Sequence, residues 1–98
     1  MSKPVNQPRR VVIEGQAIAT LARAWDALAG ALDLPAHFGR NLDALHDCLT
    51  GDVPGPLVIE WRHWRATEER LGQGVRPMRE TLEEAAATRD DLEVRFPD

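Results

Sequence analysis

Three short β-type runs, separated by stretches with helical periodicity, constrain the fold of this 98-residue chain more than any other feature. The runs are RVVIEG at residues 10–15, PLVIEW at 56–61 and DLEVRF at 91–96. Each interval between them holds two helical patterns, so the predicted order is β-α-α-β-α-α-β. Helices between successive strands favour an α/β fold with a parallel sheet and right-handed crossovers.

The first two helices are predicted from their end signals and apolar spacing. The first begins after the N-cap residue Thr20 and ends before Pro35. Its apolar stripe recurs at i, i+4, i+7 and i+11, as Leu21, Trp25, Leu28 and Leu32. The second helix lies between the N-cap residue Asn41 and Gly51, which is expected to end it.

The segment RHWRATEERL at residues 62–71 predicts a third helix, and GQG at 72–74 predicts a break. A fourth helix carries Pro77 in its first turn, where proline is tolerated. Its apolar stripe consists of Val75, Met78, Leu82 and Ala85. The three tryptophans, Trp25, Trp61 and Trp64, are expected to be structural.

Composition narrows the domain organisation and the partner class. We expect residues 1–9 to form a flexible tail and residues 10–98 to form a single domain. The formal net charge of −4 argues against nucleic acid or an anionic membrane as partner, because both attract a cationic surface. A single cysteine, with neither a signal peptide nor an apolar run of membrane-spanning length, favours the cytoplasm.

The second helix carries an unusual group of acidic residues in the stretch NLDALHDCLTGD. Asp43 and Asp47 are one turn apart and repel each other, Asp47 opposes the helix dipole, and Asp52 follows. On a helical wheel, these two aspartates share one face with His46 and Thr50. The opposite side is apolar and consists of Leu42, Leu45, Cys48 and Leu49. The helix is therefore expected to bury its leucines and expose a compact acidic face.

Three interpretations of this face are open. They are an ordinary solvated surface, a metal site to which His37 or His63 adds a ligand, and a pair of catalytic carboxylates. No established metal-binding spacing accompanies it. Three glutamates of the fourth helix, Glu80, Glu83 and Glu84, point away from its apolar stripe and read as solvated. They gain interest only if the fold brings them beside the acidic face.

Residues 37–64, HFGRNLDALHDCLTGDVPGPLVIEWRHW, resemble the barstar family of intracellular ribonuclease inhibitors. The resemblance covers residues 10 to about 96 and weakens after residue 65. It implies a three-stranded parallel sheet covered by helices, neither catalysis nor a cofactor, and a cis peptide bond between Gly55 and Pro56.

The resemblance also implies a binding mechanism, in which acidic side chains replace RNA phosphates in the enzyme's cationic active site. Asp47 matches the family's principal acidic anchor, and Asp43 matches its companion. Further matching positions are Gly39, Asn41, Gly51 and Glu84. The chain departs from the family at four contacts: His37, His46 and Asp52 replace aromatic residues, and Arg40 replaces an acidic one. These departures suggest a diverged ribonuclease partner.

The leading functional hypothesis is therefore a non-catalytic inhibitor, monomeric when free, that binds a basic microbial ribonuclease one-to-one. Protection against a self-made enzyme and immunity to a delivered nuclease toxin are both compatible with it. A rival from another class is a small metal-dependent enzyme that uses His37, Asp43, His46 and Asp47. A barstar-like domain that binds some other basic protein is a further alternative.

Overall fold

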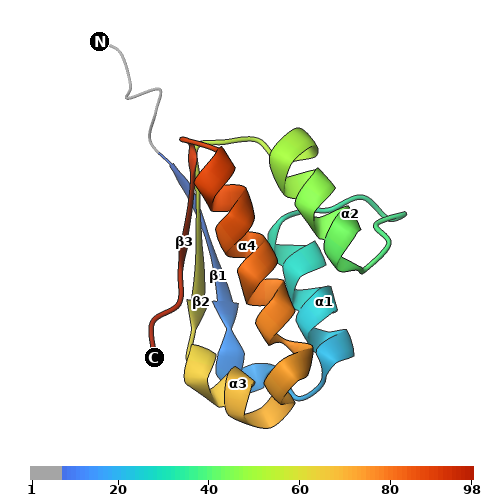
Figure 1. Cartoon of the computed structure of the whole chain (residues 1–98), viewed down its shortest axis with the longest axis vertical. Coiled ribbons are helices and arrows are strands. Elements are labelled where there is room, and N and C mark those ends of the chain that lie inside the picture. Colours follow the sequence, from blue (N-terminus) through green and yellow to red (C-terminus); the bar gives the residue numbers. More distant parts are fainter. Residues whose placement is uncertain (1–7) are drawn as a thin grey trace.

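A three-stranded parallel sheet in the order β1-β2-β3 forms one layer of the protein (Figure 1). The computed structural model describes residues 8–98. The strands span Arg9–Glu14, Leu57–Arg62 and Leu92–Arg95. The predicted parallel sheet is confirmed. Of the expected tail, residues 1–7 lie outside the described residues, while Arg9 is already the first residue of β1 rather than part of a tail.

The four predicted helices are present as α1 (Leu21–Ala31), α2 (Leu42–Asp47), α3 (Trp64–Leu71) and α4 (Arg76–Thr88). Short 3-10 turns follow β1 at Gly15–Ala17 and α3 at Gly72–Gly74. Both predicted N-caps form. The Thr20 hydroxyl accepts the Arg23 N–H at 3.1 Å, and the Asn41 side chain accepts the Ala44 N–H at 2.8 Å.

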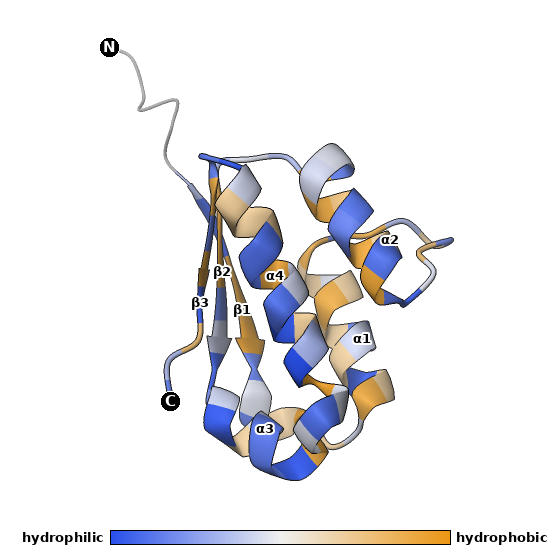
Figure 2. Cartoon of the chain, in the orientation of Figure 1, coloured by the Kyte–Doolittle hydropathy of each residue, from blue (hydrophilic) through white to orange (hydrophobic). Residues whose placement is uncertain are grey.

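Helices α1 and α4 lie on the same side of the sheet, with α2 beyond them and α3 at the carboxyl ends of β1 and β2 (Figure 1). Blue and orange residues alternate along α2 and α4 in Figure 2, as expected of amphipathic helices. The core lies between the two layers, and its largest fully buried hydrophobic side chains are Trp61, Leu28, Leu45, Leu49, Leu57, Ile59, Met78, Leu82 and Val75. No helix within residues 8–98 is long and apolar enough to cross a membrane.

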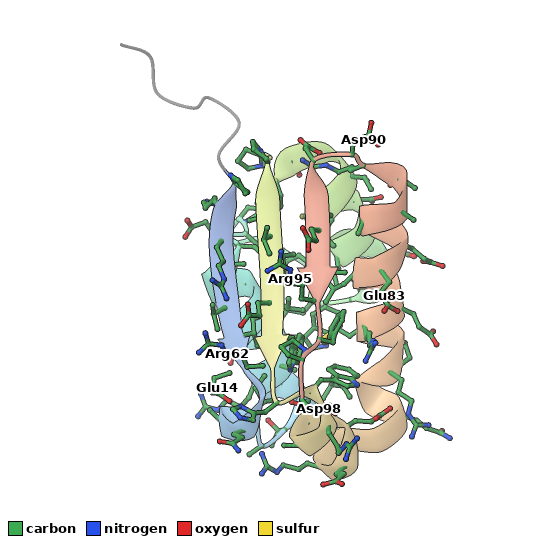
Figure 3. The ribbon with its side chains drawn as sticks, turned by 90° about the vertical axis from the view of Figure 1, so that its left-hand side faces the viewer. Glu14, Arg62, Glu83, Asp90, Arg95 and Asp98 are labelled. Atoms are coloured by element: carbon green, nitrogen blue, oxygen red, sulfur yellow. The ribbon has the colours of Figure 1, made fainter. Side chains whose placement is uncertain are left out.

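The other face of the sheet, here called the open face, carries paired charges instead of helices (Figure 3). Glu60 on the central strand accepts hydrogen bonds from both Arg10 and Arg62, the latter at 2.8 Å. These two guanidinium groups hold the pKa of Glu60 below its ordinary value. Glu93 and Arg95 form a further pair at 2.6 Å on β3. Helices normally cover both faces of a parallel sheet. Here charged side chains in ion pairs occupy the face that has no helices.

The carboxyl ends of the strands are fastened by a buried hydrogen-bond chain. The Trp61 indole N–H donates to the Thr67 hydroxyl at 3.1 Å, and that hydroxyl donates to the Gly15 carbonyl at 3.0 Å. A Cβ at position 15 would collide with the Arg62 backbone, so only glycine fits there. Trp61 and Trp64 are buried and pack edge to face at 5.4 Å. Their predicted structural role is confirmed.

Two predicted core leucines are instead partly exposed. Leu21 and Leu42 each keep 37% of their surface accessible. With Trp25 and Pro77 they line an open groove of about 520 Å³ between α1, α2 and the start of α4. The expectation that α2 buries all its leucines is therefore wrong at Leu42, because α1, α2 and the start of α4 leave this groove open.

Candidate functional site

Helix α2 separates its apolar and acidic residues as the sequence predicts. Leu45 and Leu49 are fully buried and Cys48 is nearly so. Asp43 and Asp47 are exposed on the other side. Burial of the leucines against the rest of the core holds this short helix in place, since six residues are too few for an independently stable helix. The two carboxylates therefore stand on a fixed support.

The helical path does not stop at Gly51, contrary to prediction. It continues as a π-helical turn, η2, over Cys48–Asp52, closed by the Val53 N–H donating to the Cys48 carbonyl at 2.8 Å. Pro54 ends the path because it has no N–H to offer. A Cβ on Gly51 would meet nothing within 4 Å, so the fold does not require glycine there. Gly51 and Asp52 are both exposed at the end of this turn.

Glu84 of α4 belongs to the same side of the molecule as α2. Helix α4 packs against α2 on one flank (Figure 1). On its other flank, Arg79 stacks over Trp64 and Phe96. Glu83 accepts a hydrogen bond from Arg79 at 3.2 Å and lies on that far flank. Glu84 is about 140° around the helix from Arg79, on the flank toward α2. We call Asp43, Asp47, Asp52 and Glu84 the acidic surface.

Within the described part of the chain, the carboxylates of the acidic surface are unpaired. No Lys, Arg or His nitrogen within residues 8–98 lies within 4.0 Å of any of the four. Arg40 lies three residues before Asp43 in the sequence. Its side chain pairs instead with Asp26 of α1 at 2.7 Å. It adopts a left-handed backbone conformation, with φ of 52°. Its charge is therefore engaged by α1 instead of neutralising α2.

The two loop positions before α2 have a local structural role. The Asn41 side-chain amide donates to the Gly39 carbonyl at 3.3 Å while its oxygen caps α2. A Cβ on Gly39 would lie 2.9 Å from that amide nitrogen and would disturb the cap. Gly39 and Asn41 therefore set the start of the helix that carries Asp43.

The histidines do not converge on one site. His37 is exposed in the loop before α2, and His46 is half-buried on α2. His63 lies at the end of β2, where its Nδ1 is 2.6 Å from a Glu14 carboxylate oxygen. No three His, Cys, Asp or Glu side chains in the described part of the chain come together as metal ligands. The geometry thus fails to support the metal-dependent enzyme that uses His37, Asp43, His46 and Asp47.

The one cysteine offers no activated nucleophile. Burial raises the pKa of the Cys48 thiol, and the charges of Asp52 and Asp47 raise it further. A thiol with a raised pKa is a poor nucleophile, because the thiolate is the reactive form. What the surface does offer is a set of anions on fixed helices, suited to contact with a cationic group of another molecule.

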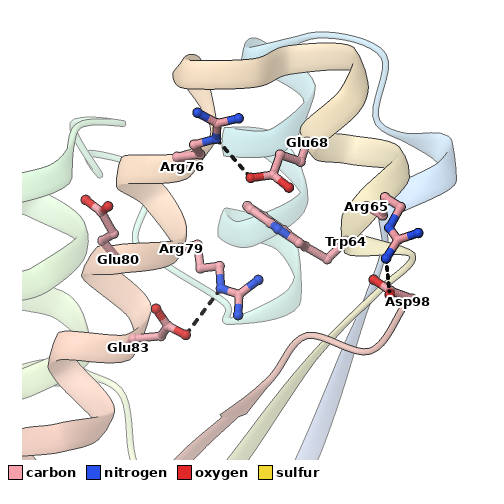
Figure 4. A pocket seen from close by; sticks show the side chains of 8 residues that line it. All are labelled: Trp64, Arg65, Glu68, Arg76, Arg79, Glu80, Glu83 and Asp98. Atoms are coloured by element: carbon pink, nitrogen blue, oxygen red, sulfur yellow. Dashed lines mark hydrogen bonds and ion pairs between the residues drawn. The ribbon is translucent and has the colours of Figure 1, made fainter.

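Another charged cavity lies away from the acidic surface, and its charges are paired with one another. It is bounded by α3, α4 and the C-terminus, and Figure 4 shows three arginines paired with carboxylates around Trp64. Arg76 pairs with Glu68 at 2.9 Å, and Arg65 pairs with Asp98 at 3.2 Å. This cavity therefore presents little unbalanced charge to a ligand.

The fold and the acidic surface define a class of protein: a small α/β domain whose packed helices present carboxylates that no cation among residues 8–98 neutralises. The family model Barstar (barnase inhibitor) matches residues 9–97, and the chain belongs to this family. A Bacillus subtilis (strain 168) protein named "Putative ribonuclease inhibitor YrdF" is 36% identical over 77 residues. That alignment covers 79% of this chain and 85% of the relative. The cis peptide bond expected at Gly55–Pro56 is present.

Proposed function

We propose that this protein inhibits a basic microbial ribonuclease by covering its active site with the acidic surface. The observation that carries this proposal is that all four of its carboxylates lack cationic partners within the described residues. Family membership and the name of the Bacillus relative support the same class of function. A ribonuclease active site must attract phosphates, so it offers the cations that these carboxylates lack.

The inhibitor's carboxylates act as phosphate mimics. Asp47 and Asp43 stand one turn apart on α2, Asp52 ends the π-helical turn, and Glu84 adds a fourth charge from α4. Asp43 and Asp47 repel each other in the free protein, and a cationic cleft relieves that repulsion on binding. Helical supports restrict their movement, so little conformational entropy is lost when the complex forms.

We further propose a one-to-one complex, a monomeric free protein and a cytoplasmic site of action, where a cell's own RNA needs protection. Self-protection and immunity to a delivered nuclease use the same surface. Exposed His37 and half-buried His46 flank the aspartates and replace the family's aromatic contacts, so the partner's rim is expected to differ from that of barnase.

A titration of microbial ribonucleases, barnase and diverged homologues, tests the proposal. Cleavage of a fluorogenic RNA should fall to zero at one equivalent of inhibitor for at least one enzyme. The association rate should decrease as salt rises, because the Debye length shrinks from about 8 Å at 0.15 M to about 3 Å at 1 M. Full RNA cleavage by every enzyme in the panel at micromolar inhibitor would refute it.

A further inference from the structure

The segment that follows α2 leaves the backbone carbonyl of Leu49, a fully buried residue, without a helical partner. The carbonyl of Leu49 would accept from residue 53 or 54 if the helix continued. The Val53 N–H is already given to Cys48, and Pro54 has no N–H. A buried carbonyl without a donor is destabilising, so this turn needs a donor from elsewhere.

Arg89, directly after α4, supplies that donor across 40 residues of sequence. Its Nη1 donates to the Leu49 carbonyl at 2.5 Å and to the Val53 carbonyl at 2.9 Å. One nitrogen therefore binds both ends of the π-helical turn that carries Gly51 and Asp52. The contact ties the end of α2 to the end of α4.

The other edge of the Arg89 guanidinium is held by Asp91. The Nε and Nη2 groups donate to the two carboxylate oxygens at 2.8 and 2.9 Å, as a bidentate fork. The side chain is only 14% exposed. A Cβ on Gly55 would lie 2.6 Å from Nη2, so the chain passes directly against the fork. Since Asp91 takes up its charge, Arg89 holds the turn without neutralising Asp52.

We infer that Arg89 is a positioning residue of the ribonuclease-binding surface, which it serves without touching the enzyme. This inference rests on the proposed function. Arg89 fixes the π-helical turn against α4, so that the carboxylates of α2 and Asp52 meet the enzyme in one arrangement with Glu84. Lysine cannot replace it, because a single ammonium group cannot make the fork and both carbonyl bonds in this planar geometry.

The test compares Arg89→Lys with Arg79→Lys. Both changes keep the charge and remove a guanidinium near α4, but Arg79 pairs with Glu83 on the far flank. Unfolding midpoints and ribonuclease inhibition constants are measured on both variants. We expect both to lower stability, and only Arg89→Lys to weaken inhibition, by about tenfold. Amide exchange in residues 49–53 should accelerate in Arg89→Lys alone, with β2 unchanged.

A double-mutant cycle separates positioning from general loss of stability. The weakening caused by Arg89→Lys should shrink in an Asp52→Ala background, because the positioned group is then absent. Equal inhibition by Arg89→Lys and the unmodified protein, or a fully additive cycle, would overturn the inference while leaving the proposed function intact. If Arg89→Lys does not fold, Asp91→Asn replaces it, and a loss of about threefold is expected. Failure of the unmodified protein to inhibit any ribonuclease would instead refute the proposed function and this inference with it.

Discussion

The acidic surface and the open face of the sheet are both rich in charge, but only the open face is internally paired. On the sheet, Glu60 lies between two arginines and Glu93 pairs with Arg95. On α2, Asp43 and Asp47 have no cationic partner among residues 8–98. Pairing, rather than the number of charges, distinguishes a surface that serves the fold from one available to a partner.

The two surfaces also differ in what they contribute to the stability of the fold. The exposed Glu93–Arg95 pair contributes about 0–1 kcal/mol. Glu60 is buried, so the fold depends more on its hydrogen bonds from Arg10 and Arg62. Like charges one turn apart on α2 destabilise it by a few tenths of a kcal/mol. A chain that keeps such a penalty at one place, while pairing its charges elsewhere, is expected to use that place for function.

The largest effect on stability should come from Thr67→Val, which lies far from the acidic surface. The change removes the acceptor of the Trp61 indole N–H and the donor to the Gly15 carbonyl, leaving two buried groups unpartnered. We expect the free energy of unfolding to fall by about 2–3 kcal/mol. Denaturant unfolding measures the loss. The inhibition constant of the folded protein should stay unchanged. A matching loss of affinity would contradict the separation between residues that hold the fold and residues that bind the enzyme.

The next effect is the loss of stability at low pH, when the paired carboxylates become protonated. Hydrogen bonds from Arg62 and Arg10 lower the pKa of Glu60 below its ordinary 4.5. The fork from Arg89 likewise lowers the pKa of Asp91 below 3.8. Lowered folded-state pKa values stabilise the protein above the ordinary values, and this contribution is lost as pH falls through the folded values.

We therefore expect Glu60 and Asp91 to change the melting temperature little above pH 5. Below about pH 4.5 their protonation should lower it. Glu60→Gln should melt lower at pH 7 and decline less steeply between pH 4.5 and 3. Thermal unfolding followed by circular dichroism over this range measures both slopes. Parallel curves for the two proteins would show that the Glu60 pairs contribute nothing to the fold.

A smaller effect should come from Gly51→Ala. The glycine has no positive φ, and the added methyl group meets open space. Alanine restricts the unfolded chain, so stability should rise by about 0.4–1 kcal/mol. The methyl group stands beside Asp52 on the surface assigned to the enzyme, so inhibition should weaken. A stabilised variant that inhibits fully would place Gly51 outside the interface.

Local signals were sufficient to predict most of the fold. The caps at Thr20 and Asn41, the apolar stripes and the three β-type runs each depend on residues close in sequence, and the structure confirms them. The exposure of Leu21 and Leu42 could not be predicted in this way. It depends on where α1, α2 and α4 fail to meet, which is a property of their packing.

The candidate site shows the same division. The composition of the acidic face follows from helical spacing around Asp43 and Asp47. The engagement of Arg40 by Asp26, and of Arg89 by the end of α2, depends on long-range contacts with no local sequence signal. The π-helical turn through Gly51 also depends on such a contact. Pro54 has no N–H to donate to the Leu49 carbonyl, and Arg89 donates to it instead.

The central proposal is that Asp47 serves binding whereas the paired Glu83 does not, and replacing each by alanine tests it most directly. Both changes remove one negative charge from a helix of a protein with net charge −4, so long-range electrostatics change equally. Glu83 is paired with Arg79, whereas Asp47 has no cationic partner among residues 8–98 and repels Asp43 one turn away.

The measurement is the ribonuclease inhibition constant and the free energy of unfolding on the same two proteins. Asp47→Ala should gain about 0.5–1 kcal/mol of stability and lose at least about 2 kcal/mol of binding, or about 30-fold, because enzyme cations are left buried without a partner. Glu83→Ala should change stability by less than about 0.5 kcal/mol and inhibit fully. An Asp47→Ala protein that is less stable and inhibits as well as the unmodified chain would contradict the account.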